Sequence, residues 1–191
     1  NPESETIKPD DLCWKSAEHH IIATPMSALE SAAAEAEGLG VPAYILSDCI
    51  EGEAREIAEV HAALAKQVAS RQHPFKTPCV LLSGGETTVT VKGNGRGGRN
   101  CEFLLSLFNE LKGHDNIYAL AADTDGIDGV EDNAGAWITP NTWQQSEALS
   151  LKAETYLDAN NSYDFFDKVD VLLTTGPTLT NVNDFRAILI L

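Results

Sequence analysis

Long apolar runs are absent from this sequence of 191 residues. No stretch approaches the roughly 18 consecutive apolar residues that a membrane span needs, and the first eleven residues are polar and acidic. We therefore expect neither a membrane span nor a signal peptide, and a soluble protein of the cytoplasm. The sequence begins without Met, in what looks like a linker that ends at Pro9, which indicates a piece of a longer protein.

Basic residues and closely spaced cysteines are also scarce. Lys and Arg number 13 against 29 Asp and Glu, which gives a formal net charge of −16. Such a chain repels the phosphates of DNA and RNA, so we expect no nucleic-acid partner. The four cysteines, Cys13, Cys49, Cys79 and Cys101, form no CxxC pair. Because soft metal sites need closely spaced thiols, we interpret all four as reduced.

The N-terminal third alternates strand and helix patterns. A short apolar run over 20–23 precedes a helix to Glu37, which Thr24 and Pro25 begin, and a strand over 42–46 precedes a helix over 53–70. This β-α-β-α rhythm favours a parallel sheet covered by helices. The pattern breaks at RQHPFKTP, 71–78, which we take as the boundary between a leading segment, 1–75, and a domain over 76–191.

The second part opens with a fully apolar strand, 79–83. A glycine turn at Gly84 and Gly85 follows, and then an alternating strand, 87–91, which we expect to fold back as a β-hairpin. Further along, the patterns predict helices over 99–112 and 140–149 and strands over 117–122, 170–174 and 186–191. The sequence therefore predicts an α/β fold with a mixed, mainly parallel sheet flanked by helices and a β-hairpin insertion.

The loop Gly93–Asn100, GNGRGGRN, precedes a predicted helix. Its glycines let backbone amides turn inward, the helix adds its positive end, and Arg96 and Arg99 bring two guanidinium groups. Such a loop would bind phosphate or carboxylate. Two alternatives stay open, a hairpin turn with solvated arginines and a dinucleotide fingerprint, because Gly93, Gly95 and Gly98 match GxGxxG. The half-polar strand before the loop speaks against the fingerprint, whose first strand is normally buried on both faces.

Aspartates are crowded in ADTDGIDGVED, directly after the buried strand YALAA. Carboxylates at the end of such a strand lie where α/β folds place ligands, and their mutual repulsion calls for a cation such as Mg²⁺. A calcium loop of the EF-hand kind does not fit, because Asp128 stands where glycine is needed. The alternative is a turn with local side-chain bonds. We expect residues 93–100 and 123–132 to open onto one hollow, as phosphoryl transfer would need.

Several motifs resemble a known family. SGGETTVTV, GRGGRNCE, AADTDGIDG, DNAGA and GPTLTNVNDFRAILI resemble the C-terminal MOFRL domain of the class II glycerate kinases, some of which carry the older name hydroxypyruvate reductase. The upstream EHHIIATPMSALESAAAEAEGLG and LSDCIEGEARE resemble the segment that precedes that domain. The resemblance covers nearly the whole chain with its motifs in order, so 1–75 would be the preceding segment and 76–191 the MOFRL domain.

The resemblance implies ATP-dependent phosphorylation of D-glycerate, usually to 2-phosphoglycerate, in a cleft between this part and an N-terminal domain absent here. The family's GGRN arginine falls on Arg99, which would neutralise charge on the substrate carboxylate or the transferring phosphoryl group. The family's catalytic lysine belongs to the absent domain and matches no residue of this chain. From their chemistry, we take Asp125 and Asp128 as candidates for holding Mg²⁺ or the glycerate hydroxyls.

The remaining candidates for binding substrate or phosphate come from the glycine turns and from the polar loop TTGPTLTNVND. They are Gly84, Gly85, Glu86, Thr87, Arg96, Gly97, Gly98, Asn100, Thr178, Asn181 and Asp184. The chain departs from the family pattern at Cys101, where Gln is expected, and at Leu179, where Gly is expected; the second bulks up a loop beside the cleft.

Two other functions stay open at this point. One is an NAD(P)-dependent hydroxypyruvate reductase, and the other is a substrate-binding or docking module without turnover. We expect the isolated chain to be inactive, because phosphoryl transfer needs a second set of groups in line with the phosphate clamp. The sequence leaves a homodimer open as well.

Overall fold

The computed structural model describes residues 6–18 and 20–191. In this part of the chain six strands form one sheet in the order β1-β2-β6-β3-β4-β5. The strands are β1 (Ala43–Glu53), β2 (Cys79–Thr88), β3 (Ile117–Asp123), β4 (Gly135–Ile138), β5 (Leu172–Leu173) and β6 (Asp184–Ile190). The helices are α1 (Pro25–Gly38), α2 (Ala54–Arg71), α3 (Arg99–Leu111), α4 (Pro140–Ala148), α5 (Ala153–Asp158) and α6 (Ser162–Lys168), with a short 3₁₀ helix η2 (Leu12–Ser16) before them.

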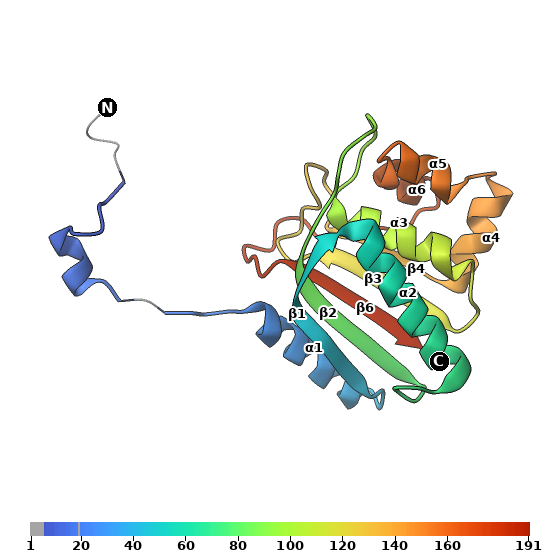
Figure 1. Ribbon diagram of the computed structural model, residues 1–191, viewed down its shortest axis with the longest axis horizontal. Helices are drawn as coiled ribbons and strands as arrows, with labels where there is room; N and C mark the ends of the chain where they lie inside the picture. Colours follow the sequence, from blue (N-terminus) through green and yellow to red (C-terminus); the bar gives the residue numbers. More distant parts are fainter. Residues whose placement is uncertain (1–5, 19) are drawn as a thin grey trace.

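Helices lie on both faces of the sheet. Helices α2 and α3 cover one face, α1 lies on the other beside β1 and β2, and the segment before α1 extends away from the body (Figure 1). Helix α1 begins where the sequence predicts, because Thr24 Oγ1 accepts a hydrogen bond from the Ser27 amide at 3.1 Å. None of the described helices combines the length and apolar character that crossing a bilayer requires.

The mixed α/β class with flanking helices is confirmed, but neighbouring strands are less parallel than predicted. The pair β1 and β2 is parallel, whereas the other four pairings in the described sheet are antiparallel. The reason is that β6 enters between β2 and β3 and runs against both. The apolar run over 20–23 forms no strand, and Ile22 is 96% exposed. Because β1 pairs with β2, the two predicted segments share one sheet.

The predicted β-hairpin is wrong, because Gly84 and Gly85 lie inside the continuous strand β2. Gly85 has a φ of +127°, and a Cβ at this position would lie 2.2 Å from the backbone of Ile50 on β1. The register of β1 against β2 also shifts between Ser47 and Ile50. The glycines therefore permit a close approach of two strands at an irregularity, a role that in sequence resembles a turn. Their predicted contact with substrate or phosphate stays a prediction.

The core lies between the sheet and helices α2 and α3. Apolar residues of α3, such as Phe103 and Leu107, are fully buried. On α2 the alanines at 58, 62 and 65 are buried, whereas Val60 is 66% exposed. This packing places the first residue of α3 at the edge of the sheet where β2 and β3 end and β6 begins.

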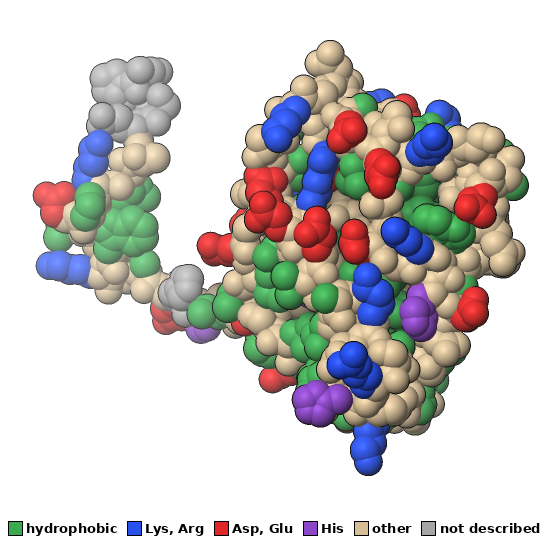
Figure 2. Space-filling view, turned by 45° about the vertical axis from the view of Figure 1, so that its right-hand side comes forward, with side chains coloured by type: hydrophobic (Ala, Val, Ile, Leu, Met, Phe, Trp, Pro, Cys, Tyr) green, Lys and Arg blue, Asp and Glu red, His purple; other side chains and the backbone are tan. Residues whose placement is uncertain are grey.

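Charge on the surface is mixed on the face that Figure 2 shows. Asp and Glu side chains gather on the upper part of the body, whereas Lys and Arg side chains lie both among them and on the lower part (Figure 2). On this face they form no continuous basic patch. All four cysteines are free thiols, with Cys79 and Cys101 buried.

We predict that Gly85→Ala lowers the free energy of unfolding by more than about 3 kcal/mol, since both the backbone conformation and the space at Ile50 oppose a side chain. Gly38→Ala is the matched control, because a Cβ there meets nothing within 4 Å. The control should be neutral or slightly stabilising. Urea unfolding followed by circular dichroism measures both, and equal effects would contradict the close approach.

Candidate functional site

Two buried carboxylates face each other at the edge of the sheet. The strand register pairs Asp123, the last residue of β3, with Asp184, the first residue of β6. Their exposed fractions are 6% and 2%. Like charges directly opposite each other on neighbouring strands are destabilising, and burial makes this worse because little water screens them. The pair therefore needs a cation.

Arg99, the first residue of α3, supplies that cation. Its Nε donates to Asp184 Oδ1 at 2.6 Å and its Nη2 donates to Asp123 Oδ2 at 2.8 Å. Its Nη1 lies 3.6 Å from Glu86 Oε1, an ion-pair distance longer than a hydrogen bond, and Glu86 itself is exposed. One edge of the guanidinium is thus fixed by two carboxylates, while Nη1 is left for a ligand. This geometry suits binding of an anionic oxygen.

Asp184 is the centre of the contacts that hold Arg99. Besides Arg99, its Oδ1 accepts a bond from Asn100 Nδ2 at 2.9 Å. Its Oδ2 accepts bonds from the amide and hydroxyl of Thr87 at 3.1 and 3.2 Å, and from Arg186 Nη2 at 2.5 Å. The structure thus brings the predicted residues Thr87, Asn100, Asp184 and Arg99 together. All but Arg99 are buried, so their contacts support the arginine, and Thr87 also lines the cavity beside it.

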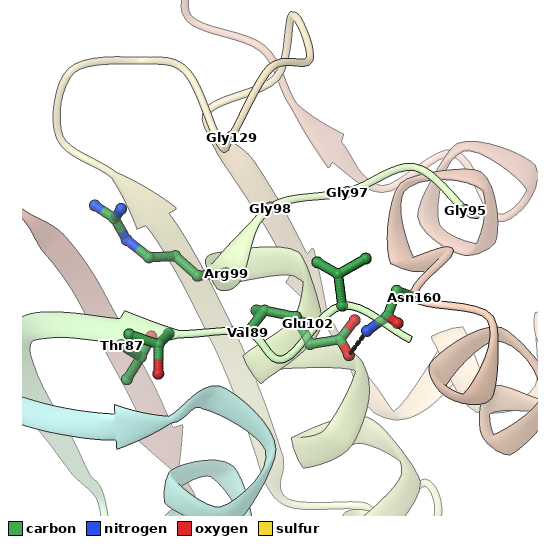
Figure 3. Close-up of a pocket in the computed structure, with 11 residues that line it drawn as sticks. Thr87, Val89, Gly95, Gly97, Gly98, Arg99, Glu102, Gly129 and Asn160 are labelled. Atoms are coloured by element: carbon green, nitrogen blue, oxygen red, sulfur yellow. Dashed lines mark hydrogen bonds between the residues drawn. The ribbon is translucent and has the colours of Figure 1, made fainter. Parts of the chain in front are cut away.

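A cavity of about 380 Å³ lies beside Arg99. Gly97 and Gly98 form one wall, Arg99 borders one end, and Asn160 borders the opposite end, with Glu102 between them (Figure 3). In the described part of the chain the amides of Gly97, Gly98 and Arg99 have no acceptor. Free amides at the start of a helix, next to a guanidinium, can bind phosphate or carboxylate.

Two asparagines after α5 fix the glycine loop. Asn160 Oδ1 accepts bonds from the amides of Lys92 and Gly93 at 2.7 and 2.9 Å, and Asn161 Oδ1 accepts a bond from the Arg96 amide at 2.8 Å. The loop is therefore held by the body of the protein and is not a free hairpin turn.

Arg96 does not join Arg99. Its Nη2 lies 2.5 Å from Glu131 Oε2, its Nη1 lies 3.5 Å from Asp164 Oδ1, and its guanidinium carbon lies 4.2 Å from the centre of the Tyr163 ring. The expectation that both arginines face one pocket is wrong. Neighbouring glycines turn the chain between them, so the two side chains point to different surroundings.

Asp128 caps helix α3. Its two oxygens accept bonds from the amides of Asn100 and Cys101 at 2.9 and 2.8 Å, and the residue is fully buried. Burial raises the pKa of its carboxyl group. A Cβ on Gly98 would lie 2.3 Å from Asp128 Oδ1, so glycine is needed where the cap meets the loop. These contacts contradict the prediction that Asp128 holds Mg²⁺.

Asp125 lies beside the polar loop that precedes β6. Its Oδ2 accepts a bond from Asn181 Nδ2 at 3.2 Å, and its carbonyl oxygen accepts one from the Thr178 amide at 3.0 Å. The Asp125 amide donates to Asp123 Oδ1 at 3.1 Å, which joins this group to the Arg99 site. Leu179, which replaces the expected glycine, is 97% exposed and borders an open hollow with Asp125 and Asn181.

A metal site made by this chain alone is not apparent. Within the described residues no three His, Cys, Asp or Glu side chains are grouped so that they could hold an ion. Mg²⁺ in kinases often takes only one or two carboxylates and completes its shell with phosphates and water. The assignment of Asp125 to Mg²⁺ therefore stays a prediction.

Three buried charges received no site role from sequence, although Asp123 belongs to the aspartate cluster ADTDGIDGVED singled out there. Asp123 stands at the end of an apolar strand, and Arg186 is the lone cation in the apolar strand β6. Glu102 lies one helical turn after Arg99, where its Oε1 accepts bonds from Arg55 Nε at 2.6 Å and Asn160 Nδ2 at 3.0 Å. A charge inside an apolar run is the signal that could have found the first two.

Asp123 should report the charge of Arg99. Burial raises its pKa to about 6, while the bond from the Asp125 amide and the charge of Arg99 lower it. We predict that Arg99→Ala raises this pKa further, because the nearest cation is lost. Arg96→Ala, the control, should leave it unchanged. Carboxyl-carbon NMR titration measures the value, and an unchanged or lowered Asp123 pKa in the first variant would contradict the pairing.

Asp128 should matter for stability. We predict that Asp128→Ala lowers the free energy of unfolding by about 2 kcal/mol, since two helix amides lose their acceptor. The loss should be the same with and without a chelator of divalent cations. Asp125→Ala, which removes a more exposed carboxylate, is the control and should cost less. If Asp128→Ala lowers the free energy of unfolding only when Mg²⁺ is present, Asp128 binds Mg²⁺ as the sequence predicts.

Comparisons with known proteins point to one family. A protein of Agrobacterium vitis named "Putative hydroxypyruvate reductase" is 49% identical over 189 residues, which are 98% of this chain and 42% of that protein. The glycerate 2-kinase of Pyrococcus horikoshii is 38% identical over 180 residues, 94% of this chain and 40% of the kinase. The crystal structure of glycerate kinase from Thermotoga maritima has a TM-score of 0.88 at 39% identity, over 91% of this chain and 42% of that one.

The chain thus spans about two fifths of the length of these relatives. The model of the MOFRL family matches residues 79–184, which run from the start of β2 to the start of β6 and contain Arg99, Asp123, Asp128 and Asp184. The chain belongs to the MOFRL family.

Proposed function

We propose that this chain is part of a glycerate kinase that transfers a phosphoryl group from ATP to D-glycerate. One observation carries the proposal. Arg99 is fixed between Asp123 and Asp184, its Nη1 makes no hydrogen bond within the described residues, and it lies beside a glycine-lined cavity with free amides. Relatives named glycerate kinase support this reaction, and the names of two of them, glycerate 2-kinase and D-glycerate 2-kinase, favour 2-phosphoglycerate as the product.

The chemistry of the reaction fits these groups. The carboxylate of glycerate and the phosphoryl oxygens of ATP are anionic, so catalysis depends on positioning and on donors that stabilise negative charge. Arg99 Nη1 would donate to one such oxygen, and the amides of Gly97 and Gly98 would donate to others. Because two carboxylates hold the guanidinium, it needs no reorganisation when the ligand binds.

Bound Mg²⁺ would neutralise charge on the phosphates of ATP. In this chain Asp125 would contribute a carboxylate to it, since Asp125 lies next to Asp123 at the same edge of the sheet. Thr178 and Asn181, which contact Asp125, would hold it in place.

We further propose that the remainder of the enzyme completes the site. The relatives are more than twice as long as this chain, which supports a further domain with the catalytic lysine that the family resemblance implies. The isolated chain would then bind anions without turnover. The homodimer and the cytoplasmic location stay predictions.

Hydroxypyruvate reduction is the alternative, because two relatives carry that name. A dinucleotide fold places the strand before its glycine loop next to the strand after the following helix. Here β6 lies between β2 and β3, so the arrangement around the glycine loop does not favour it. Release of ADP with D-glycerate and ATP supports the kinase, and oxidation of NADH or NADPH with hydroxypyruvate supports the reductase.

In the complete enzyme, Arg99→Ala should lower turnover by about two orders of magnitude, on the scale of a lost transition-state donor. Arg96→Ala is the matched control from the same loop and should change turnover only a few-fold, because Arg96 faces Glu131 and Tyr163. Coupled assay of ADP release measures both. A few-fold loss for Arg99→Ala, or rapid ADP release by the 191-residue chain alone, would overturn the proposed roles.

A further inference from the structure

A second arginine lies behind the carboxylate that holds Arg99. Arg186 is two residues after Asp184 on β6, so both side chains lie on the same face of the sheet. It is 1% exposed, and its Nη2 donates to Asp184 Oδ2 at 2.5 Å and to Thr87 Oγ1 at 3.1 Å. Its guanidinium carbon lies 5.0 Å from the centre of the Phe103 ring.

Stability gives a weak account of this buried charge. The Nε and Nη1 atoms of Arg186 have no hydrogen-bond partner within the described residues. A buried cation with unpaired donors is costly, and replacing a buried ion pair by apolar side chains of similar size is often neutral or stabilising. A contribution to stability therefore does not explain why an arginine is buried at this position.

The charges around Arg99 provide an explanation for the buried Arg186. Three carboxylates, Asp123, Asp184 and Glu86, lie within ion-pair distance of this single guanidinium. With those four groups alone the site would be negative in sum and would repel an anionic ligand. Arg186 adds a positive charge on the Oδ2 side of Asp184, while Arg99 uses Oδ1. Because Asp184 is buried and Arg99 is partly buried, water screens these contacts less than it screens surface ion pairs.

A further titratable group near Arg186 is His61. His61 on α2 is buried, with its Nε2 3.0 Å from Ser83 Oγ and its Nδ1 2.8 Å from the carbonyl oxygen of Ile57. Burial lowers the pKa of His61, which disfavours the charged form of the ring. Arg186 is then the cation that faces Asp184 from the interior.

We propose that Arg186 is a positioning residue for anion binding: by sharing Asp184 with Arg99, it offsets one carboxylate and keeps Nη1 of Arg99 attractive to phosphate. The inference rests on the part of the proposed function that makes Arg99 an anion-binding group, and it holds for any phosphorylated ligand. Arg186 touches no ligand itself.

Pyrophosphate binding to the 191-residue chain tests this, with calorimetry at two salt concentrations as the measurement. Arg186→Met removes the charge and should weaken binding at least tenfold, which corresponds to about 1.4 kcal/mol. Arg186→Lys keeps the charge and should bind within about threefold of the parent chain, on the same scale. Arg71→Met, an exposed position at the end of α2, makes the same change in net charge and should have no effect.

Asp184→Asn keeps the proposal testable if Arg186→Met does not fold. This variant removes one carboxylate while both cations stay, so it should bind pyrophosphate more tightly than the parent chain. A merely structural role for the Asp184–Arg186 pair predicts weaker binding, because Arg99 would lose its anchor. Unchanged affinity in Arg186→Met, or weaker binding in Asp184→Asn, would overturn the proposal.

Calorimetry of pyrophosphate does not depend on the reaction. If the complete enzyme releases no ADP with glycerate, yet Arg186→Met weakens pyrophosphate binding and Asp184→Asn strengthens it, the proposed kinase fails and this inference survives. If the complete enzyme releases ADP and the two variants bind pyrophosphate like the parent chain, the proposed kinase survives and the role of Arg186 fails.

Discussion

The repulsion between Asp123 and Asp184 is the constraint on which the site depends. The strand register fixes these carboxylates opposite each other, and the surrounding core keeps water from screening them. Arg99 resolves the conflict only because α3 begins at this edge of the sheet. The same interaction leaves one end of the guanidinium unused, so the group that stabilises the fold here is also the group that can bind a ligand.

The start of α3 is therefore determined from several sides. Asp128 accepts bonds from the first-turn amides, Gly98 is small enough to lie against it, and Asn160 holds the loop that leads into the helix. These contacts come from three separate parts of the chain. They explain why a loop with so many glycines has one defined conformation, and why its two arginines have different surroundings.

Much of the local structure could be predicted from the sequence. Helices α1, α2 and α3 lie within one or two residues of their predicted bounds, because a proline start, apolar periodicity and glycine breaks are local signals. Strand β4 and helices α5 and α6 went unpredicted, since four to seven residues carry too little periodicity. The central place of β6 could not be predicted either, because strand order depends on packing between distant segments.

In the candidate site, too, some features could be predicted from the sequence and others could not. That Thr87, Arg99, Asn100 and Asp184 belong together could be predicted from their motifs. Their separate roles depend on burial and register, which residue types do not encode: Asp128 looks like a metal ligand in sequence and is a helix cap in space. Gly85 likewise looks like a turn and allows two strands to approach.

The central position of β6 has a consequence for synthesis. It follows all the other strands in the chain, yet it separates β2 from β3. While the ribosome is still making the earlier segments, these two strands have no partner between them, and Asp123 has no counterpart. The two-carboxylate grip on Arg99 can thus form only after residues 184–190 have been synthesised, because Asp184 is the first residue of this last strand.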